Sequence, residues 1–243
     1  MNEHLQNKIK FKKSLSFPCS YIYGKTEKRL YVNLNNSDNI NFFVSNLTQN
    51  GFRRSYDSMY IPICENCNAC ISSRINVKDF KWSKSNKRIL KLNKDLTLKE
   101  KLESHKIERF KLFKEYSSVR HKRSPMINMT QSDFETFFYK SKNKTQIFDL
   151  VDVSNQLYGS IFVDILQDGF SAVYSFFNPY EKKRGLGKLL ILELISSLQF
   201  KNKQYLYLGY WVKQSQSMSY KFYFNNIELF SDGKWIKKKN YKV

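Results

Sequence analysis

Residues 159–198 read GSIFVDILQDGFSAVYSFFNPYEKKRGLGKLLILELISSL, and the predicted architecture is built outward from this stretch. Two runs rich in β-branched and aromatic residues, 159–166 and 170–177, flank Asp168-Gly169. This pattern predicts two strands joined by a hairpin turn. A basic loop with two glycines follows at 181–188, and the apolar run 189–198 predicts a buried helix.

Strand and helix patterns also occur on both sides of this stretch. Residues 146–153 predict a strand before the hairpin, and residues 204–211 predict a strand after the helix. A further helix is expected at 217–224 and a last strand at 226–230. This order is that of the second half of an acetyltransferase-type fold. We therefore expect an α+β fold in which residues 81–243 form an acetyltransferase-like (GNAT-type) mixed sheet with flanking helices.

The preceding residues predict a smaller unit. A strand at 29–33, a helix at 39–49 and a strand at 71–77 indicate a small N-terminal α+β module with cysteines over residues 1–80. Between the two units, apolar residues at near-helical spacing predict a helix over 98–119. A second short helix is expected at 133–139.

The chain is basic. Its 243 residues include 42 Lys and Arg against 21 Asp and Glu, a net charge of +21. A polyanion such as tRNA is a natural partner for this charge, while the alternative is a lysine-rich composition that places Lys at any solvated position. No apolar run approaches the roughly 18 residues of a membrane helix, and the start lacks an apolar signal region. We expect a cytoplasmic protein without membrane association.

Three of the four cysteines form the pattern Cys64-x-x-Cys67-x-x-Cys70, with Cys19 as the remaining thiol. Thiolates at this spacing converge readily on one metal, and a fourth ligand completes a tetrahedron. Zinc or an iron–sulfur cluster is expected on these four residues. The alternative is a turn that holds three small residues with no ligand.

A glycine-bearing loop, Arg184-Gly185-Leu186-Gly187, precedes the apolar helix. Glycines at a helix N-terminus let backbone N–H groups approach a phosphate, although a loop that needs positive φ explains them equally well. Acetyltransferases have Arg/Gln-x-x-Gly-x-Gly/Ala here, and Leu189 stands where the last small residue belongs. This departure counts against coenzyme A and leaves room for another phosphate-bearing donor.

Asp164 lies within an otherwise apolar strand, where a carboxylate must be paired, raised in pKa or functional. The alternative is simple alternation, in which one strand face is wet. The segment 207–211, rich in aromatic residues, is either packing or the wall of an acyl pocket. The only histidines are at 4, 105 and 121, so a histidine-dependent triad within residues 122–243 is excluded.

Taken in order, several segments carry a resemblance to one family. They are Cys19-x-Tyr21, Gly51-Phe52-Arg53-Arg54-Ser55, the cysteine run from Tyr60-x-Pro62 to Arg74, Leu90-x-x-Asn93-x-Asp95-Leu96, Ser171 to Pro179, Leu186-Gly187, Leu208-Gly209-Tyr210-Trp211 and Met218-x-Tyr220-Lys221. The chain resembles the bacterial branch of the arginyl-tRNA–protein transferases, the aspartate/glutamate leucyltransferases, over about residues 19–221.

The resemblance implies a donor, an acceptor and an outcome. The donor is leucyl-tRNA, the acceptor is a protein that begins with Asp or Glu, and the product is marked for N-degron (N-end rule) degradation. The ester donor is already activated, so no cofactor is expected to be required for catalysis. In eukaryotic relatives a CxxC pair and an adjacent Cys-Cys pair are linked to metal or cluster binding. Ile22 stands where one of those thiols would be, so that ligand set does not carry over residue by residue.

The site expected from these arguments has three parts. Asp164 is expected to accept the proton of the attacking α-ammonium group. Arg53, Arg54 and Arg74 are candidates for the acceptor's carboxylate, with phosphate contact or solvation as the alternative. The aminoacyl-tRNA is expected to contact Tyr174, Arg184, Gly187, Lys188, Tyr210 and Lys221. Rival hypotheses are an acyl-coenzyme A N-acetyltransferase and a non-catalytic tRNA-binding protein.

Overall fold

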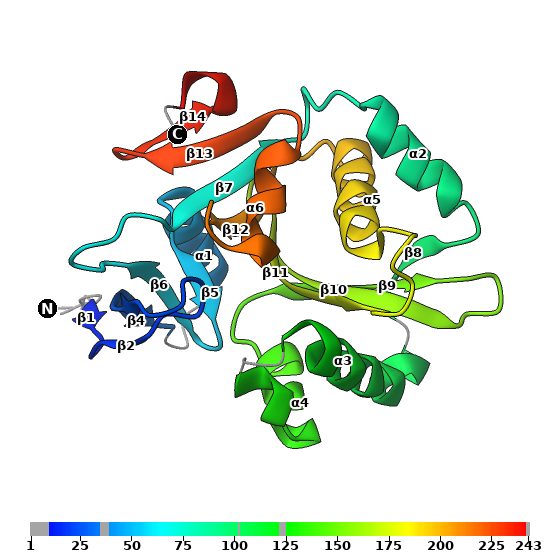
Figure 1. The fold of residues 1–243 in the computed structure, drawn as a ribbon, viewed down its shortest axis with the longest axis horizontal. Helices are drawn as coiled ribbons and strands as arrows, with labels where there is room; N and C mark the ends of the chain where they lie inside the picture. Colours follow the sequence, from blue (N-terminus) through cyan, green and yellow to red (C-terminus); the bar gives the residue numbers. More distant parts are fainter. Residues whose placement is uncertain (1–9, 35–38, 102, 122–124, 242–243) are drawn as a thin grey trace, which may run out of the picture.

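The computed structural model describes residues 10–34, 39–101, 103–121 and 125–241. Within these residues a large mixed sheet of eight strands runs through the centre of the molecule (Figure 1). Its strand order is β14-β13-β7-β12-β11-β10-β9-β8. The bounds are β7 Ile71–Asn76, β8 Thr97–Glu100, β9 Thr145–Val151, β10 Leu157–Ile165, β11 Gly169–Phe177, β12 Tyr205–Trp211, β13 Ile227–Ser231 and β14 Lys234–Lys237.

Helices cover both faces of the β8–β11 half of this sheet (Figure 1). One face carries α5 (Leu186–Phe200), on whose outer side α2 (Lys84–Leu92) packs, and the other carries α3 (Lys106–Arg120) and α4 (Gln131–Tyr139). Side chains of β10 alternate between the two faces, as the pleat requires. Ile161 and Val163 join the α5 core, whereas Phe162 joins the aromatic core under α3 and α4.

A second, smaller sheet lies in the N-terminal part of the chain. It consists of β1 (Lys12–Lys13), β4 (Arg29–Asn33), β6 (Ser58–Pro62) and β5 (Arg53–Ser55), with α1 (Ile40–Gln49) beside it. The short pair β2 (Phe17–Pro18) and β3 (Thr26–Glu27) precedes it. β7 follows this module in the chain but pairs with β12 and β13 inside the large sheet. The two parts expected from the sequence, with a boundary near residue 80, therefore share a sheet.

The predicted fold class is confirmed, since three antiparallel strands, a glycine loop, a helix and a strand follow one another as expected. The helix predicted over 98–119 is wrong in its first part. Thr97–Glu100 is an edge strand paired with β9, a 3₁₀ turn (Glu103–His105) follows, and α3 begins only at Lys106. Leu98 packs on the α5 core as a strand residue, which the helical spacing of the apolar residues concealed.

The predicted helix at 217–224 is shorter and irregular in the structure. It consists of α6 (Gln216–Ser219) followed by a 3₁₀ turn (Tyr220–Tyr223). The helix α2 was not predicted, because polar and basic residues make up most of its sequence. Its N-cap Ser83 accepts a hydrogen bond from the backbone of Asn86, and Ile89 and Leu90 supply its apolar contacts.

The strands β11 and β12 run parallel and pair only at their first residues. Their register ends at Ser171 opposite Tyr207. Beyond this point β11 stays with β10 as far as Phe177, while β12 follows β7 to Trp211. The two strands therefore separate, and the sheet opens at this place. Among the described residues no helix is long and apolar enough to cross a bilayer.

Candidate active site

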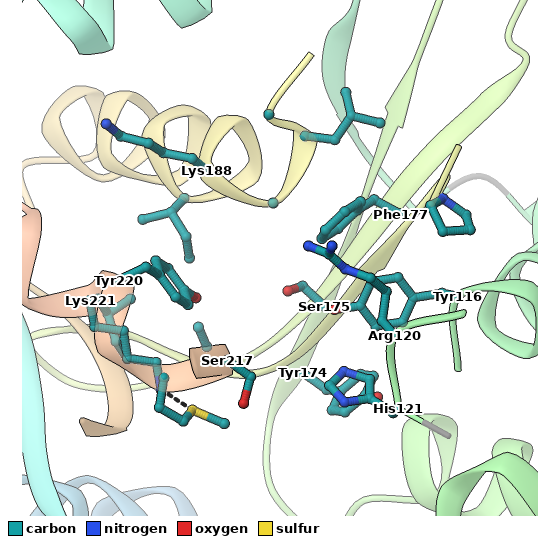
Figure 2. A pocket seen from close by; sticks show the side chains of 18 of the residues that line it. Tyr116, Arg120, His121, Tyr174, Ser175, Phe177, Lys188, Ser217, Tyr220 and Lys221 are labelled. Atoms are coloured by element: carbon teal, nitrogen blue, oxygen red, sulfur yellow. Dashed lines mark hydrogen bonds between the residues drawn. The ribbon is translucent and has the colours of Figure 1, made fainter. Parts of the chain in front are cut away.

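A pocket of about 850 Å³ lies where β11 and β12 separate. Its walls come from those strands, the start of α5, the end of α3, and the α6 segment with its following turn. Figure 2 shows Lys221, Tyr220 and Ser217 on one side, and Tyr116, Arg120 and His121 on the other. Segments far apart in the sequence thus meet around one space.

The pocket lining is strongly cationic. It contains Arg53, Arg120, Lys182, Lys188 and Lys221, and Glu181 is the one carboxylate among the described lining residues. A recess lined by one sign of charge concentrates ligands of the opposite sign. Phosphates and carboxylates are the ligands that this lining attracts.

Arg53 spans the gap between the separating strands. Its Nη2 donates to the carbonyl oxygen of Val173 on β11 at 3.0 Å, and its Nη1 lies 3.5 Å from the hydroxyl of Tyr21. On the β12 side it lies against Gly209, where an added Cβ would come within 3.1 Å of Nη1. Among the described residues no carboxylate forms an ion pair with Arg53. Arg53 is therefore a cation in the wall of the pocket that has no carboxylate partner in the parts of the chain that the structure describes.

Lys221 is a second cation without an acidic partner in the described parts of the chain. Its side chain is buried, with 5% of the residue exposed. The Nζ donates to the carbonyl oxygen of Tyr210 at 2.7 Å and lies 3.2 Å from Sδ of Met218 (Figure 2). Burial, assisted by the charge of Arg53, lowers the pKa of this amine well below its usual value.

The opposite wall was missed by the sequence argument. Tyr116, Arg120 and His121 come from the C-terminal end of α3 and face the pocket together with Tyr174 of β11 (Figure 2). Burial, with a smaller contribution from Arg120, lowers the pKa of His121 below its usual value, which favours the neutral imidazole. No local motif marks these residues, since only the packing of α3 against β11 brings them to the site.

The N-terminus of α5 closes another side of the pocket. Gly185 adopts a left-handed conformation with φ of 65° at the N-cap, and Gly187 and Lys188 line the pocket. The first N–H groups of a helix lack intrahelical partners and suit an anion. Gly187 also has a packing role, because a Cβ there would lie 2.6 Å from the Phe177 ring. Leu189 is buried in the core, so its departure from the acetyltransferase pattern does not reach the pocket.

Asp164 is the principal correction to the expected site. It is 1% exposed, does not line the pocket, and accepts hydrogen bonds from Nε of Arg54 at 2.8 and 2.9 Å. Arg54 also donates from Nη1 to the carbonyl oxygen of Tyr56 at 2.9 Å. The two residues form a buried ion pair between the two sheets. Asp164 is therefore buried away from the pocket, and Arg54 already has a carboxylate partner.

Arg74 and Arg184 also lie outside the pocket lining, each held by an acidic partner. Nε of Arg74 donates to Glu228 at 2.8 Å. Arg184 donates to Asn93 at 2.8 Å and to Asp95 at 2.5 Å, which ties the loop before α5 to the end of α2. Arg74 thus links β7 to β13, and Arg184 links the loop before α5 to the end of α2, so both arginines have a structural role.

Tyr210, which was expected to contact the aminoacyl-tRNA, does not line the pocket either. Its hydroxyl donates to the carbonyl oxygen of Tyr60 at 2.9 Å, and the residue is 1% exposed. Of the residues expected at the site, the structure places five in the pocket lining: Arg53, Tyr174, Gly187, Lys188 and Lys221.

The four cysteines are free thiols. Sγ of Cys19 accepts backbone N–H groups of Tyr21 and Ile22 at 3.4 Å each. Burial, followed by Glu27 and the other three thiols, raises the pKa of Cys70 to about 12. Across the described ranges no group of three or more His, Cys, Asp or Glu residues is placed to hold a metal ion. The thiols as placed therefore do not fit a metal or cluster, and no step of the chemistry is assigned to one.

Comparison with known proteins identifies the family. Residues 17–88 match the description "Arginine-tRNA-protein transferase, N terminus", and residues 108–231 match "Arginine-tRNA-protein transferase, C terminus". A protein of Nitrosococcus oceani named aspartate/glutamate leucyltransferase is 39% identical over 90% of this chain and 91% of its own. One of Saccharophagus degradans with the same name is 34% identical over 95% and 97%.

Among solved structures, a GCN5-related N-acetyltransferase from Kribbella flavida matches at 16% identity with a TM-score of 0.37. It covers 45% of this chain and 68% of its own. Together the two parts of the family description extend over the cysteine-bearing module and the pocket, and the relative from Nitrosococcus oceani covers 90% of the chain. The chain belongs to the arginine-tRNA-protein transferase family, among the relatives named aspartate/glutamate leucyltransferases.

Proposed function

We propose that the protein transfers leucine from leucyl-tRNA to the N-terminal amine of proteins that begin with Asp or Glu, and so marks them for N-degron degradation. The names of the relatives support this function. The observation that carries it is the cationic pocket with Arg53 in its wall, an arginine without a carboxylate partner among the described residues.

The lining favours leucine over arginine as the transferred residue. Ala172, Leu186, Ile191 and Leu208 provide apolar surface where the strands separate. A buried guanidinium would need a carboxylate partner, and the only one on the described lining is Glu181, in the loop before α5. A leucyl side chain gains from the same apolar surface without any such partner.

The acceptor's acidic side chain is assigned to Arg53. Its guanidinium already donates to the backbone of β11, which fixes its position, and its charge is not neutralised by a carboxylate among the described residues. A carboxylate of Asp or Glu supplies that missing charge through charge-assisted hydrogen bonds. The α-amino group of the same residue would then be held at a fixed distance from Arg53.

The tRNA end is assigned to the cations and the helix terminus around the pocket. Lys182, Lys188 and Arg120 are placed to meet phosphates, and Tyr174 and Gly187 lie on the inner wall. The net charge of +21 favours a polyanionic partner over the whole molecule. Because the leucyl ester is already activated, no cofactor takes part in this proposal. Charged tRNA is supplied in the cytoplasm, where we place the activity.

The reaction is an aminolysis. The acceptor amine forms a C–N bond with the ester carbonyl carbon, and the tetrahedral intermediate collapses with cleavage of the C–O bond to the ribose. Holding both substrates in one pocket contributes much of the rate, because a bimolecular encounter becomes an intramolecular one.

The experiment is a transfer assay read by mass spectrometry. Peptides that begin with Glu, Asp or Ala are incubated with the protein and with leucyl-tRNA or arginyl-tRNA in separate reactions. We expect one leucyl residue on the Glu and Asp peptides from leucyl-tRNA, and little product in the other combinations. Arginine added in preference to leucine, or equal modification of the Ala peptide, would contradict the proposal.

A further inference from the structure

We infer that Lys221 is the proton acceptor of the reaction: it takes the proton of the acceptor's α-ammonium group and returns it to the ribose oxygen. This inference rests on the proposed function, because it concerns the same pocket and the same substrates. It gives a new role to a residue that the sequence suggested only as a contact of the tRNA.

The position of Lys221 is well defined. It lies on the 3₁₀ turn after α6, and its Nζ is fixed by the carbonyl oxygen of Tyr210 on β12. The residue lines the pocket although only 5% of it is exposed. A polar atom that is buried and still borders the cavity is placed for contact with a bound substrate.

Burial and one neighbouring cation disfavour the charged form of Lys221. After burial itself, Arg53 of β5 lowers the pKa of the amine most, whereas Cys70 before β7 raises it by a smaller amount. The Nζ contacts the carbonyl oxygen of Tyr210 and the thioether of Met218, and Tyr220 lies on the same side of the pocket (Figure 2). Within the described residues none of the ion pairs includes Lys221. A buried ammonium without a carboxylate, beside another cation, loses its proton readily. The lowered pKa agrees with this geometry and favours the neutral amine, whose lone pair can accept a proton.

The acceptor nitrogen loses two protons as it passes from an ammonium group to an amide. The lone pair of Lys221 takes the first, and the resulting amine attacks the ester carbonyl. The second leaves the nitrogen of the tetrahedral intermediate for the solvent. When the C–O bond breaks, the Lys221 ammonium gives its proton to the ribose oxygen and becomes neutral again. Arg53 keeps its positive charge throughout the reaction, whereas Lys221 alternates between a neutral amine and an ammonium group.

His121 is the competing candidate for the proton acceptor, since burial also favours its neutral form and it lines the pocket. It lies on the wall opposite Lys221 (Figure 2). Arg53, the residue assigned to the acceptor, is coupled electrostatically to Lys221 and lowers its pKa. The acceptor's amine is therefore expected on the Lys221 side of the pocket.

The test is the pH dependence of single-turnover leucyl transfer to a Glu-headed peptide. We compare wild type, Lys221→Met, Lys221→Arg and His121→Gln between about pH 6.5 and 9, a range that spans the α-amine pKa of about 8. Lys221→Met is expected to be slower by about 100-fold near pH 7. Its rate should then follow the fraction of free amine, rising by up to about tenfold per pH unit below the α-amine pKa and levelling off above it, so that its deficit relative to wild type narrows toward pH 9.

Lys221→Arg retains a long basic side chain, but its guanidinium stays protonated and cannot accept a proton, and we expect it to share the profile of Lys221→Met. It also serves as the second variant if Lys221→Met unfolds. His121→Gln is expected to retain the shape of the wild-type profile. A deficit in Lys221→Met and Lys221→Arg that is constant with pH, or a pH-dependent deficit in His121→Gln alone, would overturn the inference. Absence of transfer by wild type at every pH would instead refute the proposed function.

Discussion

Arg53 and Arg54 are adjacent in sequence but make different contacts. Successive side chains of a strand point to opposite sides, so on β5 the side chain of Arg54 contacts Asp164 and that of Arg53 lies in the pocket wall. The sequence presented both arginines, with Arg74, as equivalent candidates. Burial and pairing separate them, because Arg54 and Arg74 each have a buried carboxylate and Arg53 has none among the described residues.

Replacing Arg53 is predicted to damage acceptor recognition. In Arg53→Gln the KM for a Glu-headed peptide should rise about 10- to 100-fold, because a hydrogen bond to a charged group is lost. The preference for Glu over Ala at the first position should fall by a similar factor. Steady-state kinetics with both peptides measure this. An unchanged ratio of kcat/KM values between the two peptides would be inconsistent with the assignment.

Replacing Asp164 is predicted to cost stability. Asp164→Asn leaves the buried charge of Arg54 without its partner, and the free energy of unfolding should fall by about 3 kcal/mol or more. Urea unfolding measures this loss. The double variant Arg54→Met with Asp164→Leu should recover much of it, since an apolar pair replaces both charges. If Asp164→Asn were as stable as wild type but inactive in transfer, Asp164 would have to act in the reaction itself.

At the scale of elements, the separation of β11 and β12 creates the site. β12 carries a register shift at Gly209, which has φ of 69° and lies against the Arg53 guanidinium. A side chain at this position would be strained and would push Arg53 away. The strands, the glycine loop and α5 were all predictable from the sequence, because each has its own local pattern. The separation of β11 from β12 was not predictable, because it depends on the pairing of β7 with β12.

Gly209→Ala is predicted to weaken acceptor binding as Arg53→Gln does, because an added Cβ on β12 would displace the Arg53 guanidinium. The positive φ costs about 1–2 kcal/mol for a residue with a Cβ, which should appear as a lower unfolding temperature. The KM for the Glu-headed peptide should rise as in Arg53→Gln. Gly233→Ala is the matched control, because it has φ of 74° and open space around its Cβ position. Gly233→Ala should lose stability without affecting KM.

At the scale of the whole molecule, one sheet joins the cysteine-bearing module to the catalytic half. β7 inserts between β12 and β13, and Arg74 on β7 pairs with Glu228 on β13. Sequence patterns indicated two units with a boundary near residue 80. They could not show this insertion, because pairing between distant strands leaves no local periodicity. The end of α3 reaches the pocket for the same non-local reason.

The net charge of +21 predicts a steep salt dependence of tRNA binding. Each phosphate contact contributes roughly −0.7 to −0.9 to the slope of log K against log salt. With about six contacts, affinity should fall about 10³-fold between about 50 and 200 mM salt. Fluorescence anisotropy with labelled tRNA measures the slope. A slope near zero would show that the basic surface does not contact the tRNA backbone.

The central claim is that this pocket joins a leucyl ester to an acidic N-terminus without coenzyme A. Its most direct test is the mass of a Glu-headed peptide after incubation with the purified protein and leucyl-tRNA, beside a parallel incubation with acetyl-coenzyme A. We predict a gain of one leucyl residue in the first reaction and no change in the second. Acetylation of the peptide, or an unmodified peptide in both reactions, would contradict the account.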